Sequence, residues 1–384
     1  MRKPQDWGQP CPNPGCSHSR LINRGTMSAI STSLTQSGKR RIFRCGACEQ
    51  PFSETRATVF FALRTPEEPV IMALQMLLVT VALSDMGFVL GVTDATVLAW
   101  RRRAAQKAHE SHAHLLRDVP VPQGQLDERW HCIRRTHAPQ AGPDGESSDR
   151  SVDGRQGVWS SCAPACRLIL AACVGPRTCA RALPLIQMTA AAVLGVPCFG
   201  SAGCSCDLAA LIAGSHTLKP FPRSGKPGRP KQPVKEPHPD VVYGQVVKKK
   251  PQGRLQELVS RVRCGAKRFE ERGLSISPRV LERLNLALRQ ALAPLVRQSG
   301  SFCKDRTHMR RRVVLLQACY NFARPHRSWR VPLSDPEPRA AGLIQPKWRH
   351  QPPGMAAGLP EHVWTFRELL TAKFEPVHNQ SSSG

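Results

Sequence analysis

Acidic residues are scarce in this sequence. Only 28 Asp and Glu side chains stand against 55 Lys and Arg side chains, which gives a formal net charge of +27 over 384 residues. An excess of one charge repels itself unless it meets a polyanion, so the composition favours nucleic acid or another anionic surface as the partner. The length allows two or more domains and a sizeable core.

Long apolar runs are missing as well. The longest, Val70–Leu83, is shorter than the roughly 20 residues that a membrane-spanning helix needs. The N-terminal stretch Met1–Asp6 leads into no apolar signal core. The sequence therefore predicts an intracellular protein with no membrane partner. Its 15 cysteines are an odd number, which argues against a complete disulfide framework.

Two short cysteine pairs stand out in residues 7–60. The first pair is Cys11 and Cys16, and the second is Cys45 and Cys48, with a hairpin-length insert between them. This spacing is typical of a tetrahedral Zn²⁺ site with four thiolate ligands, and so short a segment needs a metal to stabilise it. A zinc-ribbon-like module is predicted here. Coincidence in a cysteine-rich chain is the alternative, and His18 could replace one thiolate.

Residues 66–112 have the pattern of three helices. Apolar residues from Val70 to Val81 form the first, residues 84–90 the second, and a third begins at Asp94 after a turn at Gly91 with Thr93 as its N-cap. This order is typical of an all-α helix-turn-helix domain whose third helix enters the major groove of DNA. An ordinary helical hairpin with a solvated basic end is the alternative. The predicted DNA-binding residues are Thr96, Trp100, Arg101, Arg102 and Arg103.

Residues 123–330 alternate between apolar strands and helices. The predicted strands are 125–130, 167–174 and 196–199, and the predicted helices are 178–194 and 207–213, with a loop over 135–157. This alternation predicts an α/β core whose strand ends face a cleft. A last helix is predicted from Arg310 to Cys319, and residues 331–384 form a Pro- and Gly-rich tail with one short helix at 364–370.

A basic, proline-rich insertion spans residues 215–250. Such a segment is expected to stay extended rather than pack into a core. It could be a solvated linker, or Gly228-Arg229-Pro230 could enter the minor groove of DNA. The predicted DNA contacts in this insertion are Arg229, Lys231, Lys248 and Lys249.

An amphipathic helix is predicted over residues 280–297. Its leucines recur at the spacing of one helical face, and Glu282, Asn285 and Arg289 share a second face. Read alone, that second face is most simply a solvated surface. Glu282 could instead be a metal-binding carboxylate, with Asp127 of the first core strand as its partner, because carboxylates suit Mg²⁺ in phosphoryl transfer.

Collinear motifs resemble those of a known family, the DDE transposases of bacterial insertion sequences of the insertion-sequence-one type. The motifs are the two Cys pairs, Phe52–Arg56, Thr96–Trp100, Leu126–Trp130, Gly157–Trp159, Val174–Thr178, Lys226–Pro230, Glu282–Asn285, Leu288–Gln290, Tyr320–Phe322 and Arg324–His326. The resemblance covers most of the chain.

The resemblance implies a ribonuclease-H-like catalytic core that uses Mg²⁺ (or Mn²⁺) to cut and join the ends of the element. Asp127 would supply the first carboxylate and Glu282 the last, with Asn285 and Arg289 near double-stranded DNA. It further implies a homo-oligomer on DNA, in the bacterial cytoplasm and associated with the nucleoid.

The sequence departs from the family at the second carboxylate. The family's Ser-Asp-Gly reads Ser201-Ala202-Gly203 here, and alanine cannot ligate a metal. Asp207 follows on a predicted helix, where it aligns with a different position, although it could compensate. Glu128 points to the opposite face of the strand from Asp127. Because Ala202 leaves the site without its second carboxylate, strand cleavage is expected to be impaired.

Two functions fit these observations. One is a DNA transposase, and the other is a non-catalytic zinc and helix-turn-helix DNA-binding protein, either a relic or a repressor. A basic ribosome- or RNA-associated protein is a third and weaker interpretation, because it leaves the helix-turn-helix pattern and Glu282 unexplained.

Overall fold

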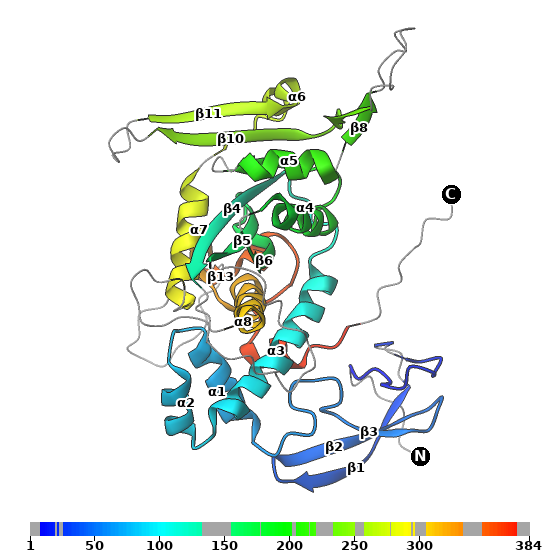
Figure 1. Ribbon diagram of the computed structural model, residues 1–384. Coiled ribbons are helices and arrows are strands. Elements are labelled where there is room, and N and C mark those ends of the chain that lie inside the picture. Colours follow the sequence, from blue (N-terminus) through cyan, green and yellow to red (C-terminus); the bar gives the residue numbers. More distant parts are fainter. Residues whose placement is uncertain are drawn as a thin grey trace, which may run out of the picture. The chain divides into compact units, whose positions relative to one another are not determined.

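The computed structural model describes residues 8–19, 21–22, 26–132, 155–176, 178–201, 205–214, 216–219, 233–249, 257–276, 278–292, 295, 305–332 and 348–374. The chain divides into two compact units (Figure 1). Unit 1 combines Met1–Leu115 with Val314–Ala323 and His362–Gly384, and unit 2 combines Leu116–Val313 with Arg324–Glu361. In the part of the chain described, no helix has the length and apolar character needed to cross a membrane.

A small antiparallel sheet opens unit 1. Its strands, in spatial order, are β1 (Met27–Thr35), β2 (Gly38–Cys45) and β3 (Pro51–Ser53). Gly38 has a φ of 113° at the β1–β2 turn, a conformation that a residue with a side chain rarely adopts. The apolar core of this module is only a few side chains, among them Phe43 and Phe52 with ring centroids 6.0 Å apart. So small a core agrees with the expectation of a metal-stabilised module.

The three predicted helices of unit 1 are confirmed. They are α1 (Glu67–Leu77), α2 (Leu83–Leu90) and α3 (Asp94–Leu115). Gly91 ends α2 in the left-handed conformation, with a φ of 63°. Thr93 caps α3, because its side-chain oxygen accepts a hydrogen bond from the backbone N–H of Thr96 at 3.3 Å. α3 continues well beyond Arg103, where the basic end of the helix was expected.

The predicted C-terminal tail, residues 331–384, is not separate, because its first part belongs to unit 2 and His362–Gly384 belongs to unit 1. Unit 1 also contains the π-helical turn η3 (Cys319–Ala323) and α10 (Phe366–Thr371), which begins with a capping box between Thr365 and Glu368. Glu67, at the start of α1, pairs with both Arg40 of β2 and Arg367 of α10. This carboxylate therefore joins the small sheet, the three-helix segment and the C-terminal helix.

Unit 2 is built on a six-stranded mixed sheet. The strands are β4 (Gln123–Cys132), β5 (Arg155–Ala163), β6 (Leu168–Gly175), β7 (Cys198–Ser201), β10 (Val242–Lys249) and β11 (Glu257–Cys264). Their spatial order is β11-β10-β7-β4-β5-β6. β4, β7 and β10 run parallel, whereas β5 is antiparallel to both of its neighbours and β11 is antiparallel to β10.

Two helices cover one face of this sheet (Figure 1). They are α4 (Cys179–Ala192) and α5 (Ser205–Gly214), which pack on buried side chains such as Leu126 of β4, Phe199 of β7 and Tyr243 of β10. The predicted strand at 167–174 and the predicted helices at 178–194 and 207–213 are therefore confirmed. The strand predicted at 196–199 is shifted by two residues.

The prediction that all of residues 215–250 stay out of the core was wrong. Val242 and Tyr243 are fully buried on β10, a strand of the main sheet. The reason is that an apolar, β-branched run lies between the lysines and packs like any other core strand. β8 (His216–Lys219) and β9 (Val234–Pro237) form a separate hairpin before it.

The remaining elements of unit 2 follow β11. They are α6 (Ala266–Glu271), α7 (Pro278–Ala291), the larger part of α8 (Arg306–Ala318), the paired strands β12 (His326–Pro332) and β13 (Trp348–Gln351), and α9 (Pro353–Ala356). α7 has the predicted amphipathic character, because Leu284 and Leu288 are buried while Leu286 is 54% exposed. It ends at Ala291, earlier than predicted.

Candidate metal centre and candidate nucleic-acid site

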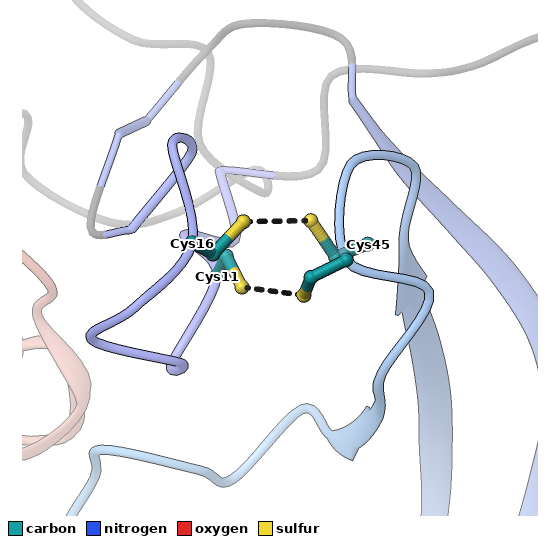
Figure 2. A group of neighbouring side chains, drawn as sticks. Cys11, Cys16 and Cys45 are labelled. Carbon is teal, nitrogen blue, oxygen red and sulfur yellow. Dashed lines mark hydrogen bonds between the residues drawn. The ribbon is translucent and has the colours of Figure 1, made fainter.

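The four cysteines of the predicted zinc module lie together. Cys11 and Cys16 come from the N-terminal loop, and Cys45 ends β2 (Figure 2). Cys48 follows in the next turn. All four sulfur atoms lie within 4.8 Å of one another. The Sγ atoms of Cys11 and Cys48 are 3.6 Å apart, and those of Cys16 and Cys45 are 3.8 Å apart.

This geometry is compatible with Zn²⁺. Four thiolates at Zn–S distances of about 2.3 Å form a tetrahedron with edges of about 3.8 Å. The Cys11–Cys48 and Cys16–Cys45 sulfur separations lie close to that edge length. His18 is not part of the group, so within the described residues the ligand set is four cysteines.

Backbone N–H groups surround these sulfurs. The N–H of His18 donates to the Sγ atom of Cys16 at 3.3 Å, and the N–H of Gln50 lowers the pKa of Cys48 to about 7. Such donors favour the thiolate form that a metal needs. Burial raises the pKa of Cys11, an effect that a bound cation would oppose.

Burial also raises the pKa of other cysteines, among them Cys162, Cys166 and Cys198 of unit 2. These three thiols are buried side chains.

The predicted DNA-binding residues of α3 divide between its two faces. Trp100 and Arg101 are only 1% and 2% exposed, so they were wrongly placed on the DNA-facing side and belong to the core of unit 1. Arg103 donates to the backbone carbonyl of Phe61 at 2.5 Å, which makes it a structural residue. Arg102 is exposed and Thr96 is partly exposed.

The exposed face of α3 follows from helical periodicity. Ala95, Ala99, Arg102 and Gln106 recur at steps of three or four residues, and all four are exposed. The sequence motif marked the helix correctly but could not show which arginine faces outward, because three consecutive arginines point in three directions.

Asp127 of β4 and Asn285 of α7 meet in unit 2. The side-chain amide of Asn285 donates to a carboxylate oxygen of Asp127, and α7 runs beside β4 (Figure 1). Asn285 is 5% exposed, so its side chain contacts Asp127 instead of a solvent-facing DNA surface. Glu282 is exposed one helical turn earlier, and Arg289 is partly exposed one turn later.

The register of the sheet places the end of β7 next to Asp127. Ser201, the last residue of β7, pairs with Leu126, the residue directly before Asp127. Ala202 lies outside the described residues. Asp207 is on α5 and 3% exposed. Glu128 pairs with Trp159 of β5.

A polar chain that the sequence did not reveal extends from Ser201. Its hydroxyl lies 2.8 Å from the Tyr243 hydroxyl, which accepts from the Gln245 amide at 2.7 Å. Gln245 in turn accepts from the guanidinium of Arg263 at 3.2 Å. These residues come from three adjacent strands and have no common sequence motif.

Among the described residues, Asp127 and Glu282 do not belong to any group of three or more close metal-ligating side chains; the four cysteines form such a group. The remaining predicted DNA contacts are less informative. Arg229 and Lys231 lie outside the described residues. Lys248 and Lys249 are on β10, where they pair with Leu258 and Glu257 of β11.

No family model matches this chain, and no curated protein matches it.

Proposed function

We propose that this chain is a DNA transposase of the insertion-sequence type, which binds the inverted ends of its element and whose strand-transfer chemistry is weakened at residue 202. The observation that carries the proposal is the contact between Asn285 and Asp127. This hydrogen bond connects the helix that bears Glu282 to the strand that bears Asp127. The resemblance requires the elements that carry the first and last carboxylates to lie side by side.

The sheet adds support. β4 lies inside the sheet, with the antiparallel β5 and then β6 on one side and the parallel β7 and β10, followed by β11, on the other. This arrangement is compatible with a ribonuclease-H-like core. Ser201 pairs with Leu126, the neighbour of Asp127. Residue 202, where the family has its second carboxylate, directly follows Ser201 in the sequence.

Mg²⁺ or Mn²⁺ would be held by Asp127 and Glu282 and would neutralise charge that develops on phosphate oxygens. These two residues fit a divalent cation in donor chemistry, but they provide two carboxylates where the family has three. Asn285 would orient the Asp127 carboxylate by its amide hydrogen bond. In this proposal the zinc module and α3 hold the DNA, on which copies of the chain assemble as a homo-oligomer.

The test is strand cleavage and joining by the full chain on DNA that carries the inverted ends flanking its gene. We expect weak Mg²⁺-dependent cleavage, a gain of at least about tenfold in Ala202→Asp, and a loss of that gain when Asp127→Asn is added. Equal activity in all three proteins would contradict the proposed site.

The non-catalytic alternative has one specific observation in its favour, which is that residue 202 offers no ligand. It predicts specific binding of the inverted ends with no cleavage in either the wild type or Ala202→Asp. A binding assay beside the cleavage assay separates the two functions.

A further inference from the structure

The strands β12 and β13 form a basic and aromatic ribbon. We use this name for residues 326–332 and 348–351. It carries Arg327, Arg330, Arg349 and His350, all exposed, and its described residues include no Asp or Glu. Trp348 is 41% exposed, although tryptophan is usually more buried than this in a folded protein.

One face of the ribbon combines a ring with cations. Arg330 pairs with His350 and Pro332 pairs with Trp348, so these four side chains lie on the same side of the two strands. The guanidinium carbon of Arg330 lies 4.7 Å from the centre of the Trp348 ring. The remaining exposed area of Trp348 is available to a second flat group.

The base of the ribbon is fixed to the rest of unit 2. His326 accepts a hydrogen bond from the backbone N–H of Ser328 at 3.2 Å, and its Nδ1 atom lies 3.3 Å from the guanidinium of Arg167. Arg167 also lies 5.9 Å from the ring centre of Trp329. The ribbon is therefore held by the turn that precedes β6 of the main sheet.

Positive charge surrounds His326 at the base of the ribbon. Burial lowers the pKa of His326, and the charges of Arg167, Arg283 and Arg324 lower it further. Arg283 follows Glu282 on α7, so the ribbon begins near the helix that carries the candidate site. The lowered pKa favours the neutral imidazole of His326, whose Nδ1 atom accepts the hydrogen bond from Ser328.

A polyanion with flat groups suits this surface. Arginines without an acidic neighbour attract phosphates, and an exposed indole offers a platform on which an unpaired base can stack. The bases of an intact duplex are already stacked on each other, so Trp348 would gain contact only where the strands are separated.

We propose that the basic and aromatic ribbon binds DNA next to α7, with Trp348 stacked on an unpaired base and with Arg330, on the same face, on the adjacent phosphate. This inference rests on the proposed function, because it describes DNA already bound by the chain. It assigns unit 2 a preference for DNA with unpaired bases at the element end.

The test compares two labelled DNAs, a blunt duplex of the element end and the same duplex with a short single-stranded overhang. Binding of the full chain is measured by fluorescence anisotropy at fixed salt. We expect Trp348→Ala to weaken overhang binding by about tenfold and blunt binding by less than about twofold. Trp348→Phe retains a ring and should restore most of the overhang affinity.

Arg330→Gln provides an independent test if Trp348→Ala does not fold. It should weaken binding of both DNAs and make it less dependent on salt. Lys267→Gln, an exposed cation on α6, is the matched control and should leave the preference for the overhang unchanged. A wild-type chain that binds neither DNA contradicts the proposed function itself. Wild-type binding that Trp348→Ala and Arg330→Gln leave unchanged overturns only the role of the ribbon.

Discussion

The side-chain amide of Asn285 on α7 donates a hydrogen bond to the Asp127 carboxylate on β4. The two residues are far apart in sequence, and Asn285 is almost fully buried at the contact. The amide is neutral, so it orients the carboxylate without neutralising the negative charge that a metal would bind. The hydrogen bond therefore holds Asp127 in one position whether or not a metal is bound.

Replacing Asn285 should therefore lower stability. We expect Asn285→Ala to reduce the free energy of unfolding by roughly 1–3 kcal/mol, because Asp127 loses a donor and a buried side chain is truncated. Urea denaturation followed by circular dichroism measures the change. Leu286→Ala, at an exposed position on the same helix, is the control and should cost much less. Equal losses in the two variants would mean that the Asn285 contact contributes little.

Removal of zinc should unfold the N-terminal module. We expect roughly one zinc ion per chain after purification without chelator. At zinc about a thousandfold above the dissociation constant, the metal would contribute about 4 kcal/mol. Metal analysis and thermal unfolding with and without a chelator check this. Cys48→Ser should lose the metal, whereas Cys264→Ser, far from the four ligands in sequence, should keep it. A full zinc content in Cys48→Ser would contradict the four-cysteine site.

Stability of unit 1 should also fall at mildly acidic pH because of His112. This residue of α3 is buried, and its imidazole donates to the backbone carbonyl of Gln317. Burial, together with the charge of His109, lowers the pKa of His112 to about 3. The folded state keeps His112 neutral, while the unfolded state takes up a proton below about pH 6.5. The stabilisation is therefore complete above pH 6.5 and declines as pH falls toward 3.

Between pH 7 and pH 5 this linkage should remove about 2 kcal/mol. The cysteine ligands also release zinc on acidification, so the comparison must be made against a variant. His112→Gln keeps an amide donor for the Gln317 carbonyl and does not titrate. Chemical denaturation of both proteins with excess zinc should show the steeper pH dependence in the wild type. Parallel curves would show that His112 takes up its proton equally in the folded and the unfolded state.

Much of the local structure could be predicted from the sequence, because periodicity and caps act over a few residues. Gly91 and Thr93 predicted the helix boundaries, and the two Cys pairs predicted the cluster of four sulfurs. β10 was missed because its apolar run lies between lysines and prolines, and these residues dominate the average hydropathy and composition of residues 215–250. The Asn285–Asp127 bond and the Ser201–Tyr243–Gln245 chain were not foreseeable as contacts, since pairing between distant elements fixes them.

Contacts between distant elements also decide which arginine of α3 is exposed, and this leads to a further prediction. A sequence motif places Arg101, Arg102 and Arg103 at the basic end of a DNA-reading helix, but the packing of unit 1 leaves only Arg102 exposed. Arg102→Ala should weaken DNA binding and reduce the slope of log affinity against log salt by about one, without a loss of stability. Arg103→Ala should instead lower the free energy of unfolding by roughly 1–3 kcal/mol, because the Phe61 carbonyl loses its donor. Salt titrations of binding and denaturation curves of both variants measure these effects. The reverse result, with Arg102→Ala unstable and Arg103→Ala deficient only in binding, would contradict the assignment of the outward face of α3.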